Sequence, residues 1–384
     1  MIYFLATRAP RFKKVLLVAR RNLLSEPLRL LISVSGVALS VFLISFLISM
    51  YRGWDEKIGG FIESSDIDVW VARDGTTDFL NAASVLPEDT GKGLEPLGDV
   101  NAWSPLIVRP MGAFTEDGEA IDISLIGYRP DPGLGRPPSI SSGEDRPGEG
   151  EAIIDASVAD RYGVELGDSI VVVGQSLRVV GISDGGNFIF WLAVFIDYAE
   201  AQRLLEQQGF ATFLVFDLND AADPGEFAAA VQAERSDLQA LTRAEFAAAT
   251  RDRVLGELLP IISVVIVLAF IVGVAVTGLT IYTATVERTR EWGILKAVGF
   301  RNGFLYRVVL IQSLVVGVLG FGVGAGLAYF VGPFAADLAP QLVLLTTWRD
   351  LFAVGVVTLV MAVAAAFVPI RRLSGIDPAN VFNG

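Results

Sequence analysis

Four long apolar runs separate the polar parts of the chain. They cover residues 30–51, 258–282, 308–331 and 351–370, and none of them contains a charged residue. Each has about 20 residues or more, the length that a helix needs to cross the hydrocarbon of a bilayer. A helix on the surface of a soluble protein keeps a polar face, so apolar character on every face predicts four transmembrane helices.

The segment between the first two runs has a different pattern. Residues 52–257 contain short alternating segments such as 66–73, which predict half-buried strands, and turns rich in glycine and proline. Helical patterns occur at 198–207 and 224–233. We therefore expect an inserted α+β domain. The aromatic segment 187–192 is interpreted as core of this domain, the alternative being an exposed site for a lipidic cargo.

A helical stalk is predicted where this domain ends. Thr242 and Glu245 have the spacing of a capping box, and no strong helix breaker follows before Pro260. The pattern predicts one nearly continuous helix over 243–282. Pro260 either kinks this helix or begins a separate one.

Basic residues indicate the orientation in the membrane. The segments 1–29, 283–307 and 371–384 together hold 14 basic and 4 acidic residues (+10), whereas 52–257 holds 15 basic and 37 acidic residues (−22). Because Lys and Arg concentrate on the cytoplasmic side, both termini and 283–307 are expected there and 52–257 outside.

The expected order is a cytoplasmic amphipathic segment (1–29), a span (30–51), the extracytoplasmic α+β domain with its stalk (52–257), a span (258–282), a cytoplasmic coupling segment (283–307), a span (308–331), a short outer loop (332–350), a span (351–370) and a cytoplasmic tail (371–384).

Composition excludes several kinds of chemistry. The chain of 384 residues has no cysteine and no histidine, so it lacks disulfides, zinc sites built on these residues, and Ser-His-Asp or Cys-His catalysis. No phosphate-binding G-x-x-x-x-G-K-[ST] motif occurs, since Gly93 follows the one Gly-Lys pair. The acidic residues of the domain are interpreted as solvated surface. We expect no enzymatic activity, no metal, no cofactor in this chain and no nucleic-acid partner.

Three motifs lie next to the predicted spans. Residues 286–299 read VERTREWGILKAVG, which predicts a short amphipathic helix with Gly299 as its stop, the alternative being a simple basic loop. Residues 19–29 read ARRNLLSEPLR and residues 369–379 read PIRRLSGIDPA. All three resemble motifs of the FtsX/MacB-type permeases of ABC transporters, which include lipoprotein-releasing and DevC-like subunits. Residues 165–168, ahead of 177–182, are similar to a strand pair of the same family.

The resemblance implies a dimeric permease that works with a separate ATPase, which binds ATP and Mg²⁺. It also implies that residues 287–299 form a coupling helix that binds the ATPase. The implied coupling residues are Glu287, Arg288, Arg290, Glu291, Trp292, Gly293, Ile294, Lys296, Ala297 and Gly299. Trp292 departs from the usual Ile or Phe, and an indole there also suits the headgroup level of a membrane.

Small residues in two spans predict close helix packing, with a dimer face as a further possibility. The predicted packing residues are Gly36 and Ser40 in the first span and Gly320, Gly322, Gly324 and Gly326 in the third.

Two functions agree with the resemblance. The first is export or extraction of an amphiphilic or hydrophobic substrate from the membrane or the outer space, driven by mechanotransmission. The alternative is a transmembrane mechanotransmitter that regulates an extracytoplasmic protein such as a cell-wall hydrolase without moving cargo. The expected location is the bacterial inner membrane, and the expected partners are an ABC ATPase, a second copy of the chain, membrane lipid and, for export, a periplasmic adaptor.

Overall fold

The computed structural model describes Ala19 and residues 25–76, 78–80, 84–186, 188–189, 191–338 and 342–374. Most of the N-terminal segment, and the Asp377–Ala379 part of the C-terminal motif, lie outside the described residues. The chain forms two compact units. One contains residues 1–52, 260–338 and 344–384, and the other contains residues 53–259 with 339–343.

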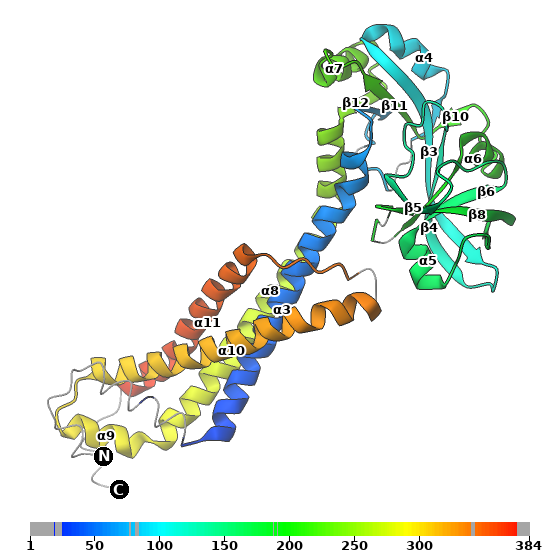
Figure 1. Ribbon diagram of the computed structural model, residues 1–384. Coiled ribbons are helices and arrows are strands. Elements are labelled where there is room, and N and C mark those ends of the chain that lie inside the picture. Colours follow the sequence, from blue (N-terminus) through cyan, green and yellow to red (C-terminus); the bar gives the residue numbers. More distant parts are fainter. Residues whose placement is uncertain are drawn as a thin grey trace. The chain divides into compact units, whose positions relative to one another are not determined.

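Four long helices contribute to the first unit. They are α3 (Pro27–Ser64), α8 (Arg243–Glu287), α10 (Asn302–Leu338) and α11 (Trp348–Ser374), with the short α9 (Thr289–Ala297) between α8 and α10 (Figure 1). All four are long and apolar enough to cross a membrane. Val41 of α3, Ala269 of α8, Val316 of α10 and Val354 of α11 meet in one buried cluster. The described residues thus contain four long apolar helices at the predicted positions.

All four helices are longer than the apolar runs within them, and α3 and α8 extend furthest beyond these runs. Helix α3 continues past residue 51 to Ser64, and α8 is one helix of 45 residues with Pro260 inside it. The alternative that a separate helix begins at Pro260 is therefore wrong. Proline removes one backbone hydrogen bond, and the intact turns on both sides keep the helix continuous. The predicted capping box forms at its start, where the Thr242 N–H donates to Glu245 Oε2 (3.0 Å) and the Glu245 N–H donates to Thr242 Oγ1 (3.3 Å).

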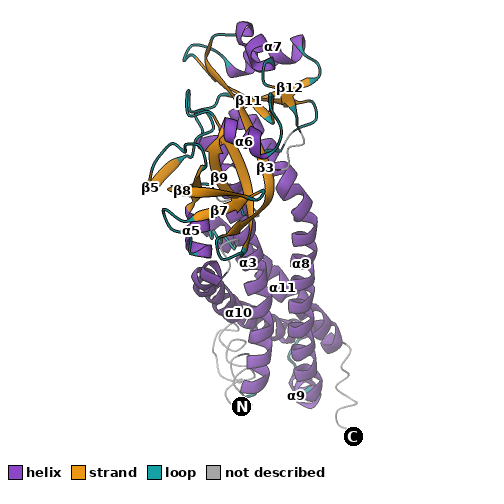
Figure 2. Cartoon of the chain, turned by 90° about the vertical axis from the view of Figure 1, so that its right-hand side faces the viewer, coloured by secondary structure: helices purple, strands orange, loops and turns teal. Residues whose placement is uncertain are grey.

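The second unit is the expected α+β domain. Its main sheet has ten strands in the order β12-β1-β11-β3-β4-β9-β6-β8-β5, with β7 paired to β3 and β8. Most neighbours are antiparallel, whereas β4–β9 and β6–β8 are parallel. Figure 2 shows the strands with the short helices around them.

The strands are β1 (Val69–Arg73), β2 (Leu86–Pro87), β3 (Val100–Thr115), β4 (Ala120–Tyr128), β5 (Ser139–Gly143), β6 (Glu151–Asp155), β7 (Ser169–Val172), β8 (Gln175–Asp184), β9 (Leu192–Asp197), β10 (Phe210–Ala211), β11 (Phe213–Leu218) and β12 (Leu238–Thr242). The helices are α4 (Thr90–Leu94), the 3-10 turn η1 (Glu95–Leu97), α5 (Ala156–Tyr162), α6 (Tyr198–Leu204) and α7 (Pro224–Glu234).

An aromatic cluster holds the helix ends of this unit to the sheet. Phe61 of α3 contacts Phe79 and Phe188, with ring centroids 5.2 Å and 5.6 Å apart, and Phe246 of α8 lies 5.1 Å from Trp70 of β1. We call these residues, with Phe195 and Phe213, the aromatic cluster. Phe188 is fully buried, and Ile189 and Leu192 are buried too, so the core interpretation is confirmed for these three residues, whereas Trp191 is of intermediate exposure.

Arg251 joins α3 and α8 below this cluster. Its Nε donates to the backbone oxygen of Asp55 (2.9 Å), and its Nη2 pairs with Glu63 (2.7 Å). A Cβ at Gly59 would lie 2.4 Å from the Arg251 guanidinium, so the glycine is needed for this close approach. Within the unit, the two helix ends are held both by aromatic packing and by one arginine.

Candidate coupling site

Within the motif 286–299 the structure has the shorter helix α9 (Thr289–Ala297), bounded by residues with non-helical geometry, whereas Val286 and Glu287 end α8. Arg288 precedes it with φ −96° and ψ 17°, which separates α9 from α8. Gly299 has φ +98°, and its N–H donates to the Lys296 oxygen (2.9 Å), while the Phe300 N–H donates to the Leu295 oxygen (3.0 Å). A left-handed glycine with these backbone bonds is a common helix end. The sequence thus folds locally into a short helix directly after α8.

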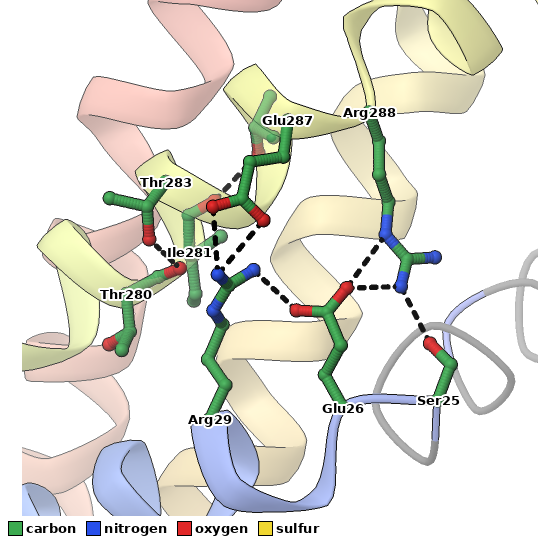
Figure 3. Close-up of polar contacts among 9 residues, drawn as sticks. Ser25, Glu26, Arg29, Thr280, Ile281, Thr283, Glu287 and Arg288 are labelled. Atoms are coloured by element: carbon green, nitrogen blue, oxygen red, sulfur yellow. Dashed lines mark hydrogen bonds and ion pairs between the residues drawn. The ribbon is translucent and has the colours of Figure 1, made fainter.

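Four charged residues connect the start of α3 to the end of α8, as Figure 3 shows. Arg288 Nε donates to Glu26 Oε1 (3.2 Å) and Arg288 Nη2 to Ser25 Oγ (2.6 Å). Arg29 Nη2 donates to both carboxylate oxygens of Glu287, at 2.9 and 3.0 Å, and Arg29 also pairs with Glu26. We call Glu26, Arg29, Glu287 and Arg288 the ion-pair cluster.

The ion-pair cluster is partly shielded from water. The exposed fraction is 17% for Arg288, 27% for Arg29 and 30% for Glu26, whereas Glu287 is 59% exposed. Each arginine meets a carboxylate, and Glu26 accepts from both arginines, so the charges balance. Networks of partly buried charge-assisted hydrogen bonds contribute more than isolated surface pairs. The cluster therefore fixes the α8–α9 junction against the first turn of α3.

Apolar packing holds the other side of α9. Trp292 is 3% exposed and Leu295 is 9% exposed, and both belong to a buried cluster with Leu305 of α10 and Leu373 of α11. Lys296 Nζ donates to the backbone oxygen of Leu373 (2.8 Å). Residues from all three sequence motifs therefore meet at α9, although they lie far apart in the chain.

The predicted coupling residues divide between two faces of α9. Arg290, Glu291, Ala297 and Gly299 are exposed, as is Glu287 just before the helix. Trp292 and Gly293 are buried, whereas Arg288, Ile294 and Lys296 are of intermediate exposure. Trp292 is not on the surface of the described chain, because it belongs to the buried cluster that also contains residues of α8, α10 and α11.

Glu26 and Arg29 were not among the predicted site residues. Both stand in the N-terminal motif, so the motif was a signal for their importance, but their partners lie 262 and 258 positions away in the sequence. Local pattern carries no information about such distant pairing.

Two of the predicted packing glycines of α10 face α3. A Cβ at Gly320 would lie 2.5 Å from Val37, and a Cβ at Gly324 would lie 2.4 Å from the backbone oxygen of Ala38. These positions need glycine because the two backbones approach closely.

The other predicted packing residues have different surroundings. A Cβ at Gly36 would lie 2.5 Å from Val276 of α8, and Ser40 Oγ donates to the Gly36 oxygen (3.1 Å) within α3. Gly322 and Gly326 have no atom of the described chain within 4 Å of an added Cβ. The glycines of α10 thus form one face that packs within the chain and one that is open.

Four helices of membrane length, an inserted α+β domain and the short α9 packed against α10 and α11 define a multi-span membrane protein. Two family models match this arrangement. Residues 30–234 match the MacB-like periplasmic core domain, and residues 263–378 match the FtsX-like permease C-terminal. The chain belongs to the MacB/FtsX family of ABC transporter permeases, and this family implies an ATPase partner.

Relatives agree with this assignment, two of them over their full length. An uncharacterised ABC transporter permease of Mycobacterium tuberculosis is 25% identical over 376 residues, which cover 96% of this chain and 100% of that protein. One of Mycobacterium bovis is 24% identical over 371 residues, with the same coverage. The macrolide export ATP-binding/permease protein MacB of Hahella chejuensis is 23% identical over 401 residues, which cover 96% of this chain and 60% of that protein.

Proposed function

We propose that the chain is the permease subunit of a dimeric ABC transporter and that a separate ATPase docks on the exposed face of α9. The observation that carries this proposal is the convergence of three motifs at α9. Trp292 and Leu295 anchor the helix, the ion-pair cluster fixes its start, and Arg290 and Glu291 remain exposed. Because α9 is held on one face, a displacement that a docked protein imposes on its other face can be transmitted to α3, α8 and α11.

ATP and Mg²⁺ are bound, in this proposal, by the partner. The sequence contains no Walker A motif. The Hahella relative is named as an ATP-binding and permease protein, and this chain aligns with 60% of it. This supports a division in which the present chain supplies only the permease part.

The proposed cargo is amphiphilic or hydrophobic and enters from the membrane or from the outer space. The four apolar runs contain no Asp, Glu, Lys, Arg or His, whereas pathways for polar solutes through a membrane are usually marked by such residues. Helices α3 and α8 each continue from the apolar unit into the α+β domain, which supports mechanotransmission along these helices.

Pure mechanotransmission to an extracytoplasmic protein, such as a cell-wall hydrolase, is supported by the same helix continuity. Two measurements on the reconstituted complex separate the functions. Export predicts that an amphiphilic substrate raises ATP hydrolysis and that a periplasmic adaptor co-purifies. Regulation predicts that a hydrolase or its activator co-purifies and that no amphiphile affects hydrolysis.

Charge reversal at Glu291 tests the docking face. Glu291→Lys is expected to lower co-purification of the ATPase about tenfold or more, since an interfacial charge of the wrong sign costs well over the 1.4 kcal/mol that a factor of ten represents. The exposed Glu226 of α7 provides the matched control, and Glu226→Lys should leave the yield unchanged. Undiminished co-purification with Glu291→Lys would exclude this face. Deleting 292–296 is a poor test because it also removes buried Trp292 and Leu295.

Cysteine labelling tests the proposed orientation. Ser141 and Asn302 are both exposed, and the natural chain contains no cysteine. In intact cells, a membrane-impermeant maleimide is expected to label Ser141→Cys and not Asn302→Cys, because the basic segments stay in the cytoplasm. After the membrane is permeabilised, both should react, which shows that both thiols are accessible. Labelling of Asn302→Cys alone in intact cells would reverse the topology.

A further inference from the structure

An apolar groove lies between α10 and α11, beside the first half of α11. Its volume is about 590 Å³. The residues that form it include Gly317, Phe321 and Ala325 of α10 and Trp348, Phe352 and Gly355 of α11. We call it the α10–α11 groove. It lies wholly within the unit that contains the apolar helices.

Small residues create the hollow, and aromatic residues border it. A Cβ at Gly355 would lie 3.7 Å from the Phe321 ring, so a larger side chain there would enter the groove. Trp348 is 87% exposed and Phe352 is 76% exposed, which is unusual for large apolar side chains in water but ordinary at a lipid-facing surface. The groove is therefore open toward the membrane.

The dimensions of the groove suit one acyl chain of one leaflet. Along α11 its lining runs from Trp348 to Leu359, a distance of about 16 Å at the rise of an α-helix. One leaflet occupies about half of the ~30 Å hydrocarbon thickness, or ~15 Å. The volume also falls within the range of about 300–1,000 Å³ that is typical of small-molecule sites. A lipid tail that lies along the groove would fill it from the interface to the bilayer centre.

A positive charge stands at the interfacial end of the groove. Arg349 is exposed, and it lies one helical turn before Phe352 and two turns before Val356, both of which line the groove. Among the described residues, no carboxylate forms an ion pair with Arg349, whereas the neighbouring Asp350 pairs with Arg52 (2.5 Å). Arginine binds phosphate oxygens through its planar fork, and tryptophan favours the headgroup level.

We propose that the α10–α11 groove binds an anionic phospholipid, with one acyl chain along α11 and the phosphate held by Arg349. The apolar walls offer a tail the contacts of a protein interior, and Arg349 adds charge complementarity for the headgroup. A second copy of the chain is the competing occupant of the groove, and a disulfide test at Phe352 distinguishes it from a lipid. The inference rests on the helices and on Arg349, not on the proposed transport function.

Photo-cross-linking tests the site with the full chain in nanodiscs of phosphatidylethanolamine and phosphatidylglycerol. The probe is a phosphatidylglycerol with a diazirine in one acyl chain, and labelled residues are located by mass spectrometry. Labels are expected on residues 348–359. Arg349→Gln should lower this labelling about fivefold, the enrichment that one basic residue near a membrane surface provides, and Arg349→Lys should keep most of it. Equal labelling of Arg349→Gln and the natural chain would overturn the phosphate contact.

Filling the groove provides an independent test. Gly355→Leu should abolish labelling at 348–359 by both phosphatidylglycerol and phosphatidylethanolamine probes. Val360→Phe adds volume at an exposed position of the same helix outside the groove and should leave labelling unchanged. If a Gly355→Leu protein has the elution volume and thermal stability of the natural chain and its labelling is unchanged, the proposal that lipid binds in the groove is wrong. In the cysteine-free chain, spontaneous disulfide dimers of Phe352→Cys in nanodiscs would show instead that a second copy covers it.

Discussion

Reversal of the charge at Glu26 is expected to release α9 and to uncouple the permease from its ATPase. Glu26→Arg would place three arginines together, because Arg29 and Arg288 both pair with Glu26. The loss of partly buried, charge-assisted hydrogen bonds should cost about 1.5–3 kcal/mol. A loss of this size corresponds to about a tenfold or larger decrease in ATPase binding if docking requires the ordered helix. Thermal unfolding of the purified permease and co-purification of the ATPase measure the two effects.

The reciprocal substitution distinguishes the effect of losing the ion pair from the effect of the changed charge at residue 26. Glu26→Arg combined with Arg288→Glu restores an opposite-charge pair at this position and should recover most of the stability and of the ATPase binding. Arg253 and Glu257 of α8 form a control pair, with exposed fractions of 64% and 68%. Exchange of these two charges should change the free energy of unfolding by less than about 0.5 kcal/mol. A double variant as impaired as Glu26→Arg alone would contradict the role of pairing.

Removal of the Phe61 ring is expected to produce the largest loss of stability. Phe61 is 1% exposed and contacts Phe79, Phe188 and Phe195 at centroid distances of 5.2, 5.6 and 6.0 Å. Phe61→Ala would leave a cavity at the centre of the aromatic cluster and should lower the free energy of unfolding by about 3–5 kcal/mol. Denaturation followed by tryptophan fluorescence measures this change, since Trp70 lies in the same cluster.

The functional consequence of Phe61→Ala distinguishes anchoring from docking. ATPase co-purification should remain normal, because α9 and the ion-pair cluster belong to the other unit. Hydrolysis stimulated by substrate should decrease, since α3 is no longer fixed to the sheet. Phe114→Ala is the control: its ring is 50% exposed on β3, and its removal should change stability by about 0.5 kcal/mol or less. Equal stabilities of the two variants would show that the aromatic cluster does not anchor α3.

Long β3 shows why some elements of the domain were missed. Pro105 and Pro110 normally interrupt a strand, so the local composition does not predict a strand of this length. In the structure β3 extends from Val100 to Thr115, with Pro105 opposite Leu214 of β11 and Pro110 opposite Ser124 of β4. The strand changes partners along its length, so neighbours that are distant in sequence stabilise a segment whose local composition is unfavourable.

The features that the sequence determined by itself are those that depend on neighbouring residues. Apolar runs specify the four long helices because length and hydrophobicity are local properties, and Thr242 with Glu245 specifies the start of α8 because a capping box closes within one turn. Only the tertiary structure decided that α3 continues to Ser64, since residues after the apolar run gain contacts that are distant in sequence: Phe61 packs against Phe195 of β9, and Glu63 pairs with Arg251 of α8. It also decided that Arg288 pairs with Glu26. The path of the chain, and not the local pattern, determines which distant charges become neighbours.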